Sequence, residues 1–485
     1  MASPDAFLSA GRRLPGWVLA PALAFTLAGA PELLGAAALG AAMGWSCAAA
    51  FLLGFVPAVW IAARSMSARF ARASVQNGPE LLGCRFGGKG QWIASLALLA
   101  VSVSGAAVAL AVVARAAMAM HCFDALVRGR GWTVASIYPG VVMGAAMVAL
   151  LAYLWGGFAA SVYGRAIQFC FLLAGLVPFS VQAVAGVGGW SGLAAAGANA
   201  SVAGWAVAAG AGSSRWNVAG WSGPLGWAFL LGAGVVAGLI SGSADPRLHA
   251  LFGLLAPRAR GNPRAARPVP AGSIALPGGA ILLLGLLLVA AAMGAAAALA
   301  PTPQTTVRES MIEGAIVRTT TVARPEEAAG HGLVPAMMDA SDSRLVTGQG
   351  GKPRLDYALA LPKLGSGLLA TEAGQRALGL FLAALLAALL ASVSAHLAAA
   401  TQLLVQVVPW RLRRGPESAE GRLRLTRWLA VAALAPAAAL ALLLAHHGAS
   451  STSLLAAWAV AWVLMLAPLS LAQRAVSAAT RGARR

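Results

Sequence analysis

Long runs without charged residues constrain this chain of 485 residues more than any other feature. A helix needs about 20 mainly apolar residues to cross the hydrocarbon core of a bilayer. From Leu14 to Ala63 the only charge is Glu32, so this stretch has the length of two crossings with a turn near residues 40–46. Further runs cover residues 91–121, 132–157, 158–187, 217–244, 270–300, 377–410, 428–445 and 450–473, with Arg115 interrupting the run 91–121 and Arg165 near the start of the run 158–187. The sequence therefore predicts an all-α polytopic membrane protein with about ten spanning helices.

The composition excludes other classes of protein. Apolar residues make up 59% of the chain and charged residues 10%, whereas soluble domains are about 45–50% apolar and about 25% charged. The four cysteines have no metal-binding spacing, so we expect packing residues rather than a zinc site or disulfides. We find no catalytic triad, phosphate-binding loop or metalloprotease signature, and we do not expect an enzyme.

The basic residues predict the orientation of the chain. Ten helices place both termini on one side, and that side carries 23 Lys and Arg residues, counting Arg165 and Arg247. The shorter loops of the other side carry three: Arg128, Arg130 and Arg215. Because short cytoplasmic loops are enriched in Lys and Arg, we expect both termini in the cytoplasm and the protein in the cytoplasmic (inner) membrane. The net charge of +20 is then a topology signal, and the lipid bilayer rather than nucleic acid is the expected partner.

Ten helices divide into two halves of five. The predicted parts are a cytoplasmic N-terminus (1–13), a first repeat with helices 1–5 (14–187), an external Trp- and Gly-rich loop (188–216), a second repeat with helices 6–10 (217–473) and a basic cytoplasmic C-terminus (474–485). The second repeat contains one long polar segment, residues 301–376, which we expect to be external. In transporters built from inverted repeats, the first and sixth helices are discontinuous and hold the substrate near the midplane.

Both of these helices carry signs of interruption. Pro31 follows Gly29 and precedes Glu32, the one carboxylate inside an apolar run, and proline removes a backbone donor from a helix. In the sixth run four glycines precede Asp245-Pro246 and weaken the helix: Gly232, Gly234, Gly238 and Gly242. Intramembrane acids are costly and usually functional. We therefore expect a midplane binding site at these two breaks.

Four short motifs resemble the sodium/solute symporter family, and within it the cation/acetate branch. They are Phe7-Leu8-Ser9-Ala10-Gly11-Arg12-Arg13-Leu14-Pro15, Gly156-Gly157-Phe158 running on to Leu176-Val177-Pro178, Asp245-Pro246-Arg247-Leu248 with Phe252, and Asp356-Tyr357-Ala358-Leu359-Ala360-Leu361-Pro362. The resemblance implies a five-plus-five inverted-repeat fold of the leucine-transporter type. It also implies cation-driven symport of a small solute.

The resemblance further implies a sodium site. Its ligands would be the carbonyl groups of Phe25, Ala28 and Ala388 with the hydroxyl of Ser392. The chain departs from the acetate branch where that branch has Ser-Thr-Ala-Asp, because it has Ala391-Ser392-Val393-Ser394 and lacks one hydroxyl and one acid. Hard cations prefer several oxygen ligands, so the coupling ion is either Na⁺ or H⁺, and we expect no other cofactor.

Two functions remain open at this stage. The first is symport of a small monocarboxylate such as acetate, with Gly29, Ala30, Glu32 and Ala109 around the substrate and Glu32 also binding the coupling proton. The second is a homologue that no longer transports and acts as a solute sensor or as a membrane partner protein. The missing hydroxyl at Ala391 favours this second function. The sequence leaves the oligomeric state open.

Overall fold

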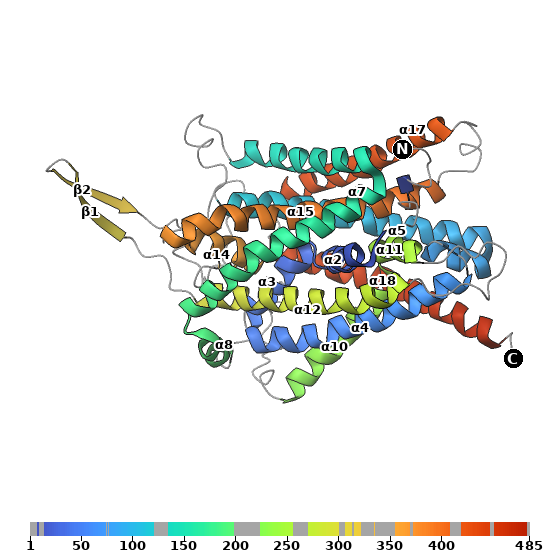
Figure 1. Ribbon diagram of the computed structural model, residues 1–485, viewed down its shortest axis with the longest axis horizontal. Helices are drawn as coiled ribbons and strands as arrows, with labels where there is room; N and C mark the ends of the chain where they lie inside the picture. Colours follow the sequence, from blue (N-terminus) through green and yellow to red (C-terminus); the bar gives the residue numbers. More distant parts are fainter. Residues whose placement is uncertain are drawn as a thin grey trace.

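The computed structural model describes residues 7–8, 14–73, 75, 77–120, 134–197, 224–255, 270–299, 306–312, 315–321, 334, 355–368, 372–407, 419–446 and 451–482. Nearly all of this part is helical, and most helices run along the long axis of the molecule (Figure 1). The helices of the first half are α2 (Gly16–Leu27), α3 (Ala30–Met43), α4 (Trp45–Ala73), α5 (Gly78–Ala119), α7 (Val134–Gly186) and α8 (Gly189–Gly197). Those of the second half are α10 (Pro224–Ala244), α11 (Pro246–Leu255), α12 (Pro270–Leu299), α14 (Ala360–Leu368), α15 (Glu372–Val407), α17 (Ala419–His446) and α18 (Ser451–Gly482).

The predicted number of crossings agrees with the helices of the described residues. Eight of these helices are long and apolar enough to span a bilayer, and α2 with α3 forms one further, broken span. The apolar part of α7 is 50 residues long, or about 75 Å at 1.5 Å per residue, against about 30 Å of hydrocarbon. Gly157 interrupts it with a φ of 62°, which glycine adopts readily, and α7 turns back there (Figure 1). With α7 counted twice, the described helices make ten crossings.

The first span is broken where the sequence predicts it. α2 ends at Leu27 and α3 begins at Ala30, with a bend of 56° between them. Gly29 is the N-cap residue of α3, and Pro31 lies in its first turn, where a missing N–H costs no helical hydrogen bond. The following turn falls at Gly44, whose φ is 83°, inside the predicted range of 40–46. Proline and glycine thus determine both the break of the first span and the following turn through the backbone conformations they favour locally.

The glycines of the sixth run have a different role from the one expected. α10 packs closely along α4, and a Cβ atom added at Gly234, Gly238 or Gly242 would collide with backbone carbonyl oxygens of α4. These glycines therefore permit close helix packing, as small residues do in membrane proteins, rather than weakening the helix. The interruption itself lies at Asp245, between α10 and α11.

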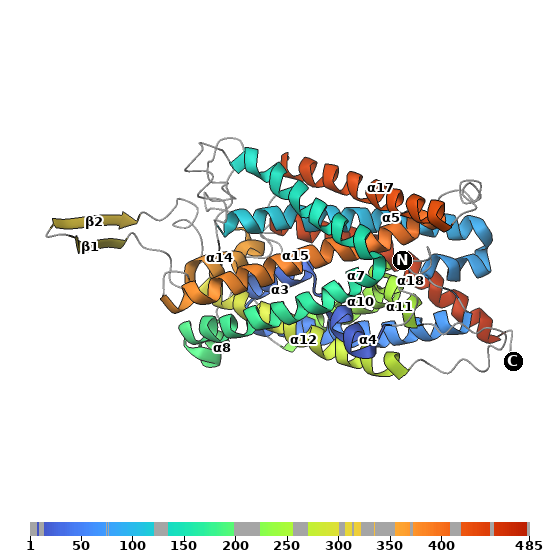
Figure 2. The ribbon, with the colours of Figure 1, turned by 45° about the horizontal axis from the view of Figure 1, so that its top comes forward.

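The predicted external segment is partly structured. β1 (Thr306–Ile312) and β2 (Ala315–Thr321) pair antiparallel with Thr306 opposite Thr321, a hairpin that the sequence analysis does not anticipate. It projects from one end of the bundle, and α18 ends at the opposite end (Figures 1 and 2). A 3₁₀ turn η5 (Tyr357–Leu359) then leads into α14. In the predicted 188–216 loop the structure describes the short helix α8, and residues 198–216 lie outside the described residues, as do Arg128, Arg130 and Arg215.

The interrupted helices lie in the core of the bundle. α12 packs against α2 and α3, and α15 packs against α7 and α5. α11 contacts α15, α4 and α5, and α18 contacts α5 and α10. The two breaks, at Ala28–Gly29 and at Asp245, therefore lie within one helical bundle, where alanine and leucine side chains dominate the buried surface.

Candidate functional site

A buried ion pair joins the two interrupted helices. Nη2 of Arg247, in the first turn of α11, lies 2.7 Å from Oε1 of Glu32, in the first turn of α3. The Arg247 side chain is 1% exposed and that of Glu32 is 15% exposed. An unpaired charge would be very costly at this depth, so each side chain depends on the other. The ion pair brings Glu32, at the first break, next to Arg247, which directly follows the second break.

Asp245 fixes the arginine in place. Its carboxylate accepts hydrogen bonds from Nε of Arg247 at 3.2 and 3.3 Å and from Nη2 at 3.0 Å. The same carboxylate accepts the backbone N–H of Arg247 at 2.8 Å and so caps the start of α11. The guanidinium carbon also lies 4.7 Å from the ring centroid of Trp462 on α18, a cation–π contact. Arg247 is therefore oriented by its own helix while its charge faces α3.

Several polar atoms around this pair lack a hydrogen-bond partner among the described residues. They are Oε2 of Glu32, Nη1 of Arg247, Oγ of Ser392 and both ring nitrogens of His396. His396 and Ser392 lie one turn apart on α15 and are both fully buried, and the His396 ring packs against Trp458 and Trp462. Buried polar groups are normally paired. Such a concentration of unpaired donors and acceptors is typical of a site that receives a polar ligand.

The predicted substrate residues lie at the start of α3 and on α5. A Cβ atom on Gly29 would lie 2.8 Å from Oγ of Ser392 and 3.1 Å from Oε2 of Glu32, so the absence of a side chain lets α15 approach the break. Ala30 is the first residue of α3. Ala109 is buried on α5, one turn after Gly105, where an added Cβ would collide with the His396 ring.

The predicted cation residues divide between the first break and α15. Ala28 is the C-cap residue of α2, and its N–H donates to the carbonyl of Ala24. Phe25 is fully buried, as are Ala388, Ala391 and Ser392 on α15. Of the predicted ligands on α15, Ser392 is the one that lies against the break, because a Cβ atom on Gly29 would be 2.8 Å from its hydroxyl oxygen. Among the described residues, no three His, Cys, Asp or Glu side chains gather as they would around a transition metal.

Two arginines lie elsewhere than the sequence predicts. Arg165 and Arg247 were counted with the basic residues of cytoplasmic loops, but both are 1% exposed inside the bundle. Arg165 lies in the second half of α7, and its Nη1 donates to Oγ1 of Thr26 on α2. The helix-break signal at Asp245-Pro246 could have indicated Arg247, because it follows directly in an otherwise apolar stretch. Arg165 could have been indicated by its position as the one charged residue of the apolar run 158–187.

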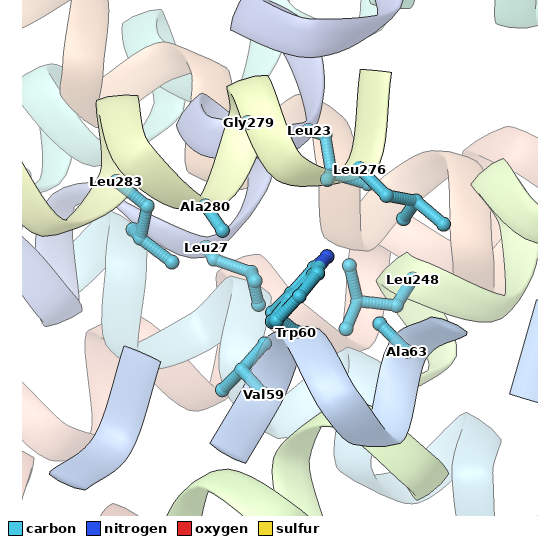
Figure 3. Close-up of a pocket in the computed structure, with 10 residues that line it drawn as sticks. All are labelled: Leu23, Leu27, Val59, Trp60, Ala63, Leu248, Leu276, Gly279, Ala280 and Leu283. Carbon is cyan, nitrogen blue, oxygen red and sulfur yellow. The ribbon is translucent and has the colours of Figure 1, made fainter. Parts of the chain in front are cut away.

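A separate pocket lies between α2, α4, α11 and α12. Figure 3 shows the Trp60 ring projecting among aliphatic side chains. The lining residues come from α2, α4, α11 and α12: Leu23, Leu27, Val59, Trp60, Ala63, Leu248, Leu276, Gly279, Ala280 and Leu283. None of them is charged, so this pocket does not offer a partner for an anionic solute and is distinct from the ion pair.

Comparisons with known proteins point to membrane transport. The sequence model described as the Sodium:solute symporter family matches residues 7–240, slightly less than half of the chain. Among solved structures, the fold resembles a Na⁺-coupled sialic acid symporter in a substrate-bound outward-open state, with a TM-score of 0.59 and 15% sequence identity over 92% of this chain and 77% of that one. A manganese transporter of Eremococcus coleocola matches with a TM-score of 0.41 and 17% identity over 96% of this chain and 81% of that one. No curated protein sequence matches the chain.

These findings confirm the predicted fold class. The likeness to the sialic acid symporter supports a leucine-transporter-type arrangement of helices, and the matched family and that structure are transporters rather than enzymes. The family match also agrees with the resemblance read from the sequence motifs. The acetate branch has no counterpart in the comparisons.

Proposed function

We propose that this protein is a secondary active transporter that couples the uptake of a small organic solute, a monocarboxylate such as acetate, to a cation. The observation that carries the proposal is the buried Glu32–Arg247 ion pair, which links the two interrupted helices. The polar atoms without partners around it supply a second argument, because they provide donors and acceptors for a ligand. The family match and the likeness to a symporter supply the class of function.

A carboxylate substrate would take the place of Glu32 on Arg247. A guanidinium binds a carboxylate through two parallel N–H groups, and Nη1 of Arg247 has no partner among the described residues. Asp245 holds the guanidinium plane through Nε and Nη2. The backbone at Gly29 and Ala30 starts α3, whose N-terminal partial charge favours an anion.

Release of Glu32 from Arg247 provides the proton coupling. Once a substrate carboxylate pairs with the arginine, Glu32 loses its counter-ion in an apolar environment, and binding a proton relieves the uncompensated charge. The Glu32 side chain is 15% exposed, but both of its carboxylate oxygens are buried. One anion and one proton then cross together without net charge, while the breaks at Gly29 and Asp245 allow the helix halves to move.

Sodium is the alternative coupling ion. The carbonyl oxygens of Phe25, Ala28 and Ala388 with Oγ of Ser392 offer four oxygen ligands, and Ser392 lies against the first break. Ala391 lacks a hydroxyl, and the hydroxyl of Ser394 donates back to the carbonyl of Ala391 at 2.9 Å. The number of oxygen ligands in this proposed sodium site is thus at the lower limit of what hard cations prefer. We further propose that the protein lies in the cytoplasmic membrane with both termini inside, as the basic loop residues indicate.

The test is uptake of labelled acetate into proteoliposomes under an imposed proton gradient, an imposed sodium gradient and neither. We expect proton-driven uptake, with at least a tenfold loss in Glu32→Gln. Gly35→Ala on the same helix is the matched control, because a Cβ atom there meets nothing within 4 Å. Unchanged gradient-driven uptake in Glu32→Gln would refute the role of Glu32.

The same preparation distinguishes the non-transporting alternative. A ligand that binds only the folded state stabilises it and so raises the unfolding temperature, by an amount that grows with the logarithm of the ligand concentration above Kd. If acetate and other small carboxylates stabilise the purified protein but no gradient drives uptake, the protein is a solute sensor rather than a transporter.

A further inference from the structure

Arg165 is a fixed positive charge in the core of the bundle. Its Nε donates to the carbonyl of Ser161 at 3.0 Å, and its Nη1 donates to Oγ1 of Thr26. The guanidinium carbon lies 5.9 Å from the ring centroid of Phe158. No carboxylate contacts Arg165 among the described residues, and Nη2 has no partner there. A guanidinium keeps its charge in proteins, so this charge lacks a direct counter-ion.

The position of this charge coincides with the first helix break. Thr26, which accepts the hydrogen bond from Arg165, lies in the chain between Phe25 and Ala28. The carbonyl groups of these two residues are half of the proposed sodium ligands. The other half, Ala388 and Ser392, is on α15, and α15 packs against both α7 and α2. Arg165 therefore lies beside the α2 half of the proposed cation site, in a region where α2, α7 and α15 pack together.

A purely structural role explains the charge poorly. Packing between α2 and α7 requires volume, and an uncharged side chain of similar length would fill it without the cost of burying a guanidinium. Intramembrane arginines normally pair with an acid or serve transport. Because Arg165 has no acidic partner among the described residues, the positive charge itself is the property to be explained.

We propose that Arg165 supplies, at the break of the first helix, the positive charge that a sodium ion would otherwise supply, so that the protein binds no sodium there. The inference rests on the proposed function and selects the proton as its coupling ion. For illustration, two unit positive charges separated by about 5 Å in a medium with an effective dielectric constant of about 20 would repel strongly enough to weaken sodium binding roughly a hundredfold. The missing hydroxyl at Ala391 fits a site that no longer holds a metal ion.

The experiment measures sodium binding without transport. The unfolding temperature of the purified protein is followed in detergent as sodium replaces potassium at constant ionic strength. We expect no sodium response in the wild type and a stabilisation in Arg165→Gln, with an apparent sodium affinity at least about a hundredfold tighter. Arg424→Gln is the matched control, because this arginine is 72% exposed on α17, and it should remain unresponsive.

Three results would overturn the inference. One is sodium stabilisation of the wild type, and another is a folded Arg165→Gln protein that ignores sodium. The third is loss of acetate-induced stabilisation in Arg165→Gln without a sodium response, which would make Arg165 a substrate ligand. If Arg165→Gln does not fold, Arg165→Lys keeps the charge and must stay unresponsive to sodium. Because sodium binding is read directly, a failure of acetate uptake would count against the proposed function and not against the role of Arg165.

Discussion

Removal of the Arg247 side chain should strongly destabilise the folded bundle. In Arg247→Met a side chain of similar length fills the space, but Glu32 and Asp245 lose the cation that compensates them. Asp245 retains the backbone N–H of residue 247 at 2.8 Å, whereas Glu32 loses an ion pair of 2.7 Å and has no other side-chain partner among the described residues. The stranded charge of Glu32 should therefore dominate the effect.

The expected magnitude follows from these contacts. Breaking a buried ion pair by removing one partner costs about 3–5 kcal/mol, and loss of the cation–π contact with Trp462 adds about 1 kcal/mol. Neutralising the stranded acid in the double variant Glu32→Gln/Arg247→Met should recover a part of this loss. We expect a coupling energy of about 1–3 kcal/mol between the two positions.

The assay is unfolding of the purified protein by titration with sodium dodecyl sulfate in mixed micelles, followed by tryptophan fluorescence. Arg424→Met is the matched control, because Arg424 pairs with Glu420 at 3.1 Å but the two side chains are 72% and 76% exposed, and exposed pairs contribute little. The reasoning fails if Arg247→Met is as stable as the wild type, or if Glu32→Gln gives no relief in its background.

Three further outcomes are expected. Gly238→Leu should lower the free energy of unfolding by about 1–3 kcal/mol, because a Cβ atom at this position collides with a carbonyl oxygen of α4. Gly232→Ala is the control, because its Cβ atom would have nothing within 4 Å, and it should be neutral or slightly stabilising. Equal unfolding curves for the two variants would contradict the close packing of α10. Gly29→Ala should reduce acetate uptake at least tenfold in proteoliposomes with normal expression, because its Cβ would press on Ser392; full activity would show that the approach of α15 to the break is not needed. Asp356→Ala should cost about 1–2 kcal/mol in the same unfolding titration, because Oδ2 accepts the N–H at the start of α18 at 2.9 Å; an unchanged midpoint would mean that this cap contributes nothing.

The sequence predicts the features that depend on local chemistry. Nine apolar runs, the first long enough for two spans, give the ten crossings, because the bilayer requires every backbone group of a span to be paired within the helix. Pro31 with Gly29 gives the first break, and Gly44 gives the following turn, because these residues act on the backbone around them. Glu32 is marked as functional because an isolated acid in an apolar run is costly.

Only the tertiary structure decides which distant residues meet. Arg247 and Arg165 are counted among the loop arginines in the sequence, because a basic residue near a helix end gives no indication of its partner. The fold buries both, pairing Arg247 with Glu32 from the opposite half of the chain and placing Arg165 on Thr26. The role of the α10 glycines in close packing likewise becomes clear only from the approach of α4. Local sequence sets backbone conformation and membrane preference, whereas burial and ion pairing depend on long-range packing, which no single segment encodes.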